Sequence, residues 1–307
     1  MNALLLAALC LVPAFSQERP QVQAIESFKG GLNTWLSPLA IADDESPNLQ
    51  NVLIDESGGI TRRKGFSRRN ATAIGGGISD VNAAYQLEQS DGDRYCIAFS
   101  STSGYYSTDG CQSFTVFIDT LTRNNDINCD ALQDRLYCSN NQYNFYVSGT
   151  NDSNISGAPA NLDGVRVFRN RCFGWGNSTN PSRLFWSNIS DCTAWTTSTD
   201  WVDIAPEDGD VILGCGPPIF DMLPCYKKFS TWVLKGYDPA SFTLINVSRT
   251  TGIKNYRTAD NYGNVQIFDS LGPYGGRPGL YAFDGIVVRE VSQKLRQGNQ
   301  RITTFGV

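Results

Sequence analysis

The stretch VRVFRNRCFGWG, residues 165–176, contains an apolar strand pattern, a short polar turn and a second apolar strand pattern that ends in glycine. The same order recurs in ALQDRLYCSNN (131–141), LPCYKKFSTWVLKG (223–236) and VQIFDSLGPYGGRPGLYAFDG (265–285). The interval between copies is roughly 35 to 50 residues, the range in which propeller blades recur. The repeat therefore predicts an all-β, propeller-like array of about four or five small antiparallel sheets.

From residue 78 onward, short apolar runs alternate with turn signals. This even spacing is typical of a sandwich, a barrel or a propeller, and the longer repeat favours the propeller. The predicted strands are 83–88, 95–100, 104–107, 114–119, 127–131, 135–139, 145–148, 165–169, 171–175, 184–187, 201–204, 211–215, 222–227, 230–235, 242–247, 264–269, 279–283 and 287–291.

The chain before this array has a different character. Residues 17–77 are expected to form an irregular, extended N-terminal segment that docks onto a neighbour. Residues 78–307 are expected to form the propeller-like domain. Within the segment, DESGG (55–59) separates two alternating runs and predicts a β-hairpin. The acidic run 43–47 is expected to be a helix start or a solvated loop, and its charge favours the loop; Gly75–Gly77 is expected to be a flexible hinge.

The first sixteen residues read as a hydrophobic leader. ALLLAALCLV (3–12) is too short to span a bilayer, Pro13 ends it, and the small residues Ala14 and Ser16 precede Gln17. This pattern predicts a signal peptide over 1–16 that is cleaved before Gln17. The alternative is a buried N-terminal strand or helix that is used in assembly. No later stretch is apolar and long enough to cross a membrane.

The eight cysteines after the leader fall into four close sequential pairs. A hairpin brings facing residues to distances that a disulfide can span, so each pair is expected to join strands within one sheet. Such bonds persist in oxidising compartments. Spacing alone does not fix the connectivity, and free buried cysteines in an intracellular protein are the alternative. The predicted pairs are Cys96–Cys111, Cys129–Cys138, Cys172–Cys192 and Cys215–Cys225.

The sequence contains no histidine, which removes Ser-His-Asp and Cys-His catalysis and the usual zinc ligand. Two acidic clusters, 43–56 and Glu207–Asp208–Asp210, suggest a glycosidase only weakly, because their spacing gives no catalytic frame. Asp208–Gly209–Asp210 resembles a calcium turn but lacks the ligand count of an EF-hand loop. We therefore predict a protein that is not an enzyme, with no catalytic, cofactor or metal site.

Basic residues concentrate at one place, just after the predicted hairpin. They suggest a docking patch or a surface that faces DNA, whereas a solvated hairpin edge protected by charge is the alternative. The net charge of −5 argues against a nucleic-acid groove as the main surface. Six N-x-S/T sequons would accept glycans only in a eukaryotic secretory route. The basic patch contains Arg62, Arg63, Lys64, Arg68 and Arg69.

One turn, Ser107–Phe114, has the sequence STDGCQSF and resembles the Asp box of sialidase-like propellers. In that turn an aspartate fixes a hairpin loop and carries no chemistry. Cys111 stands where the box has glycine, and this is the one good copy in the chain.

A second resemblance begins with FKGGLNTWLSPLAIADDESPNLQNVLIDESGGITRRKGF, residues 28–66. It is similar to the N-terminal signature of tailed-bacteriophage structural proteins, which has a GGLN opening, an acidic S-P step, an NV-x-x-D turn and an R-x-G hairpin. The second half resembles the same family at a W-S step, a D-x-x-x-W turn, a D-G-D-x-I strand entry and a Y-x-x-D-G end. These matches are Trp186–Ser187, Asp191 with Trp195, Asp208–Gly209–Asp210 with Ile212, and Tyr281 with Asp284–Gly285.

The resemblance implies a virion structural protein of the tail propeller type, such as a nozzle or stabilisation protein of short-tailed phages. It implies assembly into a ring or tube, with copies of itself and tail or portal-side proteins as partners and DNA passing through a channel. The expected location is the virion tail, or the extracellular or periplasmic space if the leader is a signal peptide. The leader and paired cysteines depart from this family. They favour the alternative, a secreted, disulfide-stapled propeller that binds glycan or protein at a cell surface.

Overall fold

The computed structural model describes residues 25, 27–70, 73–74, 81–121, 126–273 and 278–293. The chain forms two compact units, Met1–Lys64 and Gly65–Val307, so the N-terminal segment expected over 17–77 extends across this boundary. The predicted leader 1–16 and the glycine hinge 75–77 lie outside the described residues. No helix in the described part of the chain has the length and apolar character needed to cross a bilayer.

The first unit contains two small sheets. β1 (Gly31–Leu32) pairs in parallel with β2 (Glu45–Ser46), and β3 (Val52–Ile54) pairs with β4 (Ile60–Arg62) as an antiparallel hairpin. The hairpin lies where the DESGG turn predicts it. The solvated loop expected at 43–47 is wrong in its middle, because Glu45 and Ser46 form β2.

The described part of the second unit consists mainly of β-strands, with a 3-10 turn at η2 (Tyr256–Thr258), and these strands form five small antiparallel sheets, which we number in chain order. Sheet 1 contains β5 (Val81–Glu88), β6 (Arg94–Ser100), β7 (Ser103–Ser107) and β8 (Thr115–Ile118). Sheet 2 contains β9 (Asn128–Leu132), β10 (Arg135–Ser139), β11 (Asn144–Ser148) and β12 (Asn151–Asn154). Sheet 3 contains β13 (Gly164–Phe168), β14 (Arg171–Trp175), β15 (Arg183–Asn188), β16 (Asp191–Trp195) and β17 (Trp201–Asp203). Sheet 4 contains β18 (Ile212–Cys215), β19 (Met222–Lys227), β20 (Thr231–Lys235) and β21 (Thr243–Ser248). Sheet 5 contains β22 (Asp260–Tyr262), β23 (Val265–Ser270), β24 (Gly279–Phe283) and β25 (Val288–Glu290).

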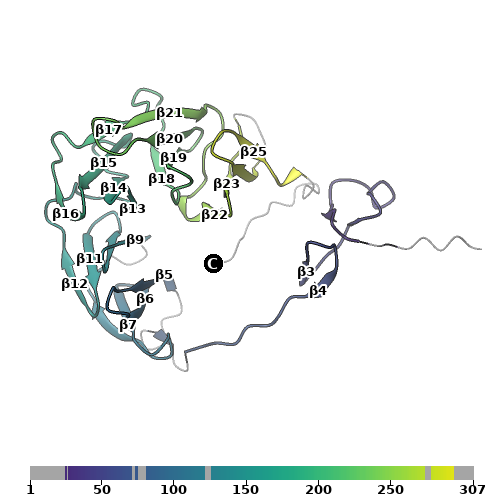
Figure 1. Ribbon diagram of the computed structural model, residues 1–307, viewed down its shortest axis with the longest axis horizontal. Helices are drawn as coiled ribbons and strands as arrows, with labels where there is room; N and C mark the ends of the chain where they lie inside the picture. Colours follow the sequence, from purple (N-terminus) through teal and green to yellow (C-terminus); the bar gives the residue numbers. More distant parts are fainter. Residues whose placement is uncertain are drawn as a thin grey trace, which may run out of the picture. The chain divides into compact units, whose positions relative to one another are not determined.

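These sheets follow one another as propeller blades do. In Figure 1 the sheets of the second unit lie in chain order along an arc, with the first strand of each sheet on the inner side. First strands contact one another, β5 with β9, β9 with β13, and β13 with β18. Side chains of β9 also bind the backbone of β13: Asn128 Oδ1 accepts from Val165 N at 2.8 Å, and Asp130 Oδ2 accepts from Val167 N at 2.7 Å. The propeller-like arrangement predicted by the repeat is therefore the observed one.

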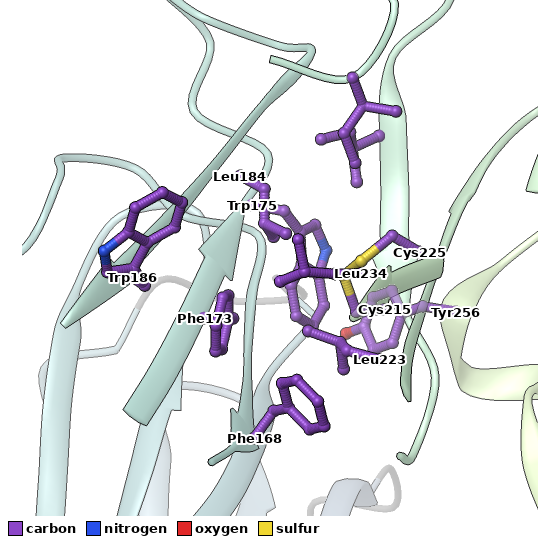
Figure 2. Close-up of a cluster of buried hydrophobic side chains, with 12 residues drawn as sticks. Phe168, Phe173, Trp175, Leu184, Trp186, Cys215, Leu223, Cys225, Leu234 and Tyr256 are labelled. Atoms are coloured by element: carbon purple, nitrogen blue, oxygen red, sulfur yellow. A yellow bond between two sulfur atoms is a disulfide. The ribbon is translucent and has the colours of Figure 1, made fainter. Parts of the chain in front are cut away.

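The hydrophobic core is divided among the faces where neighbouring sheets meet. Phe99 of sheet 1 packs edge-on against Phe145 of sheet 2 at 6.1 Å between ring centroids, and Tyr226 of sheet 4 lies 4.8 Å from Phe268 of sheet 5. Figure 2 shows the cluster between sheets 3 and 4, where Phe173 and Trp175 lie near Leu223 and the Cys215–Cys225 disulfide. Each sheet is thus stabilised mainly by its neighbours, since burial of apolar surface supplies most of the favourable free energy.

The strands that the sequence missed lie at the first or fourth position of their sheets. β12, with the sequence NDSN, pairs only with β11 and stays largely exposed, so it carries no apolar pattern. β16 and β22 were also missed, and β22 is exposed throughout. By contrast, β19 is buried along its whole length, because sheets pack on both of its faces.

Candidate functional site

All four predicted cysteine pairs are disulfide-bonded; three of the bonds join strands of one sheet, and Cys96–Cys111 joins β6 to the turn between β7 and β8. Cys129 and Cys138 are register partners on β9 and β10, with Cα atoms 4.1 Å apart. Cys215 and Cys225 are partners on β18 and β19 in the same way. The bonds do not mark every sheet, because none of the four lies in sheet 5.

The predicted basic patch is divided between the two units. Arg62, Arg63 and Lys64 end the first unit, whereas Arg68 and Arg69 begin the second, and all five are exposed. Arg69 has a structural contact: its Nε donates to the carbonyl of Gly110 at 2.9 Å in the turn between β7 and β8. At least this member of the patch helps to hold a turn.

In the acidic cluster around Asp208, a lysine ammonium group lies between the oxygen atoms. The Nζ of Lys227, which is fully buried, donates to Asp208 Oδ1 at 2.7 Å and to the carbonyls of Ala205 and Asp210 at 2.8 and 3.1 Å. An ammonium group thus occupies the position between the oxygens that a calcium ion would require. The described residues include no group of three or more His, Cys, Asp or Glu side chains suited to a metal ion.

The Asp-box turn has two equivalents that the sequence did not reveal. Asp109, Asp238 and Asp284 lie in the turn between the third and fourth strands of sheets 1, 4 and 5. Each carboxylate accepts from backbone N–H groups, such as Ser113 N on Asp109 at 3.0 Å and Ser241 N on Asp238 at 2.9 Å. Hydrogen bonds lower the pKa of all three carboxyls; the largest cause is the Ser113 hydroxyl for Asp109, the Ser241 hydroxyl for Asp238 and the Val287 N–H for Asp284. The signature was missed at 238 because PASF follows Asp238 where GCQSF follows Asp109, and at 284 because the loop between β24 and β25 is shorter.

The residues of the N-terminal signature fold the first unit. Asn33 Nδ2 donates to Glu45 Oε2 at 2.6 Å, and Asn33 N donates to the carbonyl of Ser46 at 2.9 Å, which joins the GGLN opening to the acidic step. Gly31 has φ of 71°, a left-handed conformation that favours glycine. Asp55 Oδ1 accepts from the Gly59 N–H at 2.8 Å and closes the hairpin turn.

The same unit exposes large apolar side chains between β1 and β2. Trp35 is 52% exposed, Leu36 47% and Leu39 98%. Side chains of this size are usually covered in a folded protein, and several close together mark an interaction surface. We call Trp35, Leu36 and Leu39 the apolar loop.

A polar cavity of about 390 Å³ lies in the second unit where first strands begin, and we call it the inner cavity. Asp126 precedes β9, Asp163 directly precedes β13, and Leu213 belongs to β18. Asn141 and the segment from Lys254 to Tyr256 complete the wall. The cavity therefore draws on sheets 2, 3 and 4 and on η2.

Charge in the inner cavity is only partly balanced. Asp126 pairs with Arg257 Nη1 at 3.2 Å, and Lys254 pairs with Asp269 at 3.4 Å. The half-buried Asp163 carboxylate has no hydrogen bond or ion pair among the described residues. Burial, with a smaller contribution from the Asp126 charge, raises the pKa of Asp163 to about 6. Burial also raises the pKa of Tyr256 to about 12.

Sequence reasoning did not identify these cavity residues, although a signal is present. An aspartate stands at or just before the first strand of every sheet, as a second repeat superimposed on the strand pattern. The series is Asp80, Asp126, Asp163, Asp210 and Asp260. The repeated aspartate has different partners in different sheets; Asp210, for example, accepts a hydrogen bond from Phe229 N at 3.0 Å. The sequence alone therefore does not indicate which of these carboxylates has no hydrogen-bond partner in the described part of the chain.

No protein-family model matches the sequence, and no curated protein matches it. Among solved structures, one of YCF48 bound to D1 peptide is similar over 64% of this chain and 61% of its own, with 8% identity and a TM-score of 0.44. PorZ, a component of the type-IX secretion system of Porphyromonas gingivalis, matches over 67% of this chain and 27% of its own, with 12% identity and a TM-score of 0.42. Streptogramin B lyase matches over 78% and 74%, with 9% identity and a TM-score of 0.46. The chain thus spans less than two thirds of the length of the first two.

Proposed function

We propose that the protein is a structural component of a phage-type tail, which acts by assembly rather than by catalysis. The observation that carries the proposal is the first unit. The residues of the tail-protein signature make its hydrogen bonds, and the unit exposes the apolar loop. Such a loop suits docking onto a neighbouring copy or another tail protein, because association buries apolar surface.

The second unit suits a rigid building block. Three of its disulfides join strands of the same sheet, and Cys96–Cys111 joins β6 to the turn between β7 and β8. These bonds reduce the conformational freedom of the unfolded chain and do not link one sheet to the next. The acids that the sequence raised as catalytic candidates have structural partners, such as Lys227 for Asp208 and Phe229 N for Asp210. These contacts support a role that depends on shape. In this proposal the exposed arginines at 62–69 face an acidic neighbour or DNA in the channel.

The experiment is fractionation of assembled particles from cells that express the full chain. We expect the wild-type protein in particle fractions, as rings in averaged images, and a Trp35→Ala/Leu39→Ser variant in the unassembled fraction. Tyr262→Ser is the matched control, because Tyr262 is 81% exposed but belongs to β22 in the second unit. A wild-type chain found only as free protein outside the cell would contradict the proposal.

A second function is favoured by the disulfides and the inner cavity together: a secreted propeller-like protein that binds glycan or protein at a surface. Four disulfide bonds suit an oxidising compartment, and a polar cavity of this size suits a ligand. The same fractionation separates the two functions. Free, disulfide-bonded protein in the medium, with no particle-bound fraction, is the expected result for the secreted binder.

A further inference from the structure

We propose that the inner cavity binds a small organic cation, a molecule or side chain that ends in an ammonium or guanidinium group. The inference goes beyond the proposed function and does not rest on it. The residue that would hold the cation is Asp163, with Asp126 beside it.

The size and the wall of the cavity suit such a ligand. Ligand sites in proteins are mostly concave spaces of about 300 to 1,000 Å³, and the inner cavity, at about 390 Å³, is at the small end of this range. Leu213 gives the wall an apolar surface for the ligand's carbon atoms, while Asn141 and Asn255 bring amide groups. Asn255 Oδ1 is engaged by the backbone N–H of Arg257 at 3.0 Å, which fixes the orientation of that side chain.

The charge balance selects a cation over an anion. The positive groups in and behind the wall already have carboxylate partners, Arg257 with Asp126 and Lys254 with Asp269. Asp163 is the acid of the cavity that has none among the described residues. A half-buried carboxylate loses part of its hydration, and burial accordingly raises the pKa of Asp163. A cation that donates hydrogen bonds to Asp163 would replace the lost hydration.

The local backbone holds the unpaired carboxylate in place. Asp163 N donates to the carbonyl of Trp175 at 2.8 Å, and its side chain packs directly over Gly176. A Cβ atom at residue 176 would clash with the Asp163 carboxylate, and Gly176 has φ of 84°. Only glycine therefore fits here without strain, so the carboxylate position is built into the turn after β14.

A divalent metal ion is the less suitable occupant. Calcium takes about six to eight oxygen ligands, usually with several carboxylates. The cavity offers two carboxylates, and one of them is already paired with Arg257. An ammonium or guanidinium needs fewer acceptors, so one free carboxylate with nearby amides is sufficient.

The test is a titration of the full-length oxidised protein at about pH 7.5, followed by ligand-detected NMR, with n-butylammonium and methylguanidinium as probes. Neutral 1-butanol and N-methylurea are the shape-matched controls, and calcium chloride is a separate arm. We expect saturable binding of at least one cation, with the neutral molecules binding about tenfold or more weakly, because a charge-assisted hydrogen bond is lost. Binding of calcium alone, or equal binding of cation and neutral probe, would overturn the proposal.

Asp163→Asn should weaken binding of the cation by about tenfold or more, while Asp221→Asn should not change it. Asp221 is an exposed acid outside the cavity that pairs with Arg169. Unchanged binding to Asp163→Asn would also overturn the proposal. The wild-type protein gives an independent measurement if that variant misfolds: cation affinity should fall as pH drops through about 6, where Asp163 takes up a proton. An affinity that stays constant to about pH 4.5 would count against Asp163.

Discussion

At the residue scale, the aspartates of this protein differ in function according to what surrounds them. Asp208 balances the buried ammonium of Lys227, whereas Asp109 organises a turn by accepting backbone hydrogen bonds. Asp163 does neither, because no described group donates to its carboxylate. The sequence shows all three as acids next to turns. The partners of Asp109 lie in its own turn, where the local pattern indicates them, whereas the partner of Asp208 comes from β19 and no local pattern indicates it.

Asp163 should reduce stability at neutral pH. Its pKa is raised from 3.8 to about 6 by burial and by Asp126, so the folded state binds its proton more tightly than the unfolded state does. The destabilisation caused by the ionised Asp163 carboxylate is absent below about pH 4, grows as pH rises to about 6, and is constant above that. Because the side chain is partly exposed, we expect about 1 kcal/mol. Asp163→Asn should therefore raise the melting temperature by about 2–4 °C at pH 7.5 and leave it unchanged at about pH 4.

Thermal unfolding of wild type and variant across this pH range provides the measurement. Glu207→Gln is the control, since Glu207 is an exposed acid outside the inner cavity and should show no effect at either pH. A variant that is less stable than wild type at pH 7.5 would mean that the ionised carboxylate has a stabilising partner.

At the element scale, the disulfides differ in how deeply they lie. Cys172 and Cys192 are fully buried and connect β14 with β16 across the middle of sheet 3, whereas Cys96 and Cys111 are only half-buried. The loops they close are similar, with sequence separations of 20 and 15 residues. Loop closure should therefore stabilise both by about 3 kcal/mol, and any difference between them should come from packing.

Replacing both cysteines of the buried pair, Cys172→Ala/Cys192→Ala, should lower the free energy of unfolding by more than about 3 kcal/mol, because cavities add to the lost cross-link. We expect the melting temperature to fall by about 6–12 °C. Cys96→Ala/Cys111→Ala is the matched control, and its free energy of unfolding should fall by a smaller amount. Denaturant unfolding of the oxidised proteins measures both, and equal losses would show that burial of the bond contributes nothing.

The elements that the sequence predicts well are those covered on both faces. β14 and β19 lie between packed sheets, so their apolar runs are continuous and easy to locate. β12 and β22 carry polar sequences and join their sheets mainly through backbone hydrogen bonds, which nearly every residue type can make. The pairs Cys129–Cys138 and Cys215–Cys225 were predictable because partners in a hairpin lie close in sequence. The inner cavity was not, since its wall combines loops of sheets 2 and 3, strand β18 of sheet 4 and the segment that leads into η2.

At the scale of the whole molecule, the chain combines a signature-bearing N-terminal unit with a much larger sheet array. The prediction placed the division at residue 77, where the glycine run suggested a hinge. The two compact units divide between Lys64 and Gly65, shortly after β4. The composition of the glycine run indicated flexibility, but it could not show that the hydrogen-bonded hairpin ends earlier, with Arg63 N on the carbonyl of Asn51 at 2.8 Å.

Limited proteolysis should detect this division. Residues 62–69 are exposed and, after β4 ends, have no regular secondary structure, and they contain five trypsin sites. Cleavage requires local opening, so exposed backbone outside a sheet is cut before strands are. We expect the first cut within the described residues to fall between Arg62 and Arg68 and to leave a resistant fragment that starts near Gly65.

Mass spectrometry of the early fragments identifies the site, and Arg62→Gln/Arg63→Gln/Lys64→Gln/Arg68→Gln should slow this cut. Arg94 and Arg183, which are paired with Glu88 and Asp203 on strands, should resist at that stage. Early cleavage within sheets 1 to 5, ahead of residues 62–69, would show that the weakest part of the chain lies inside the array and not between the two units.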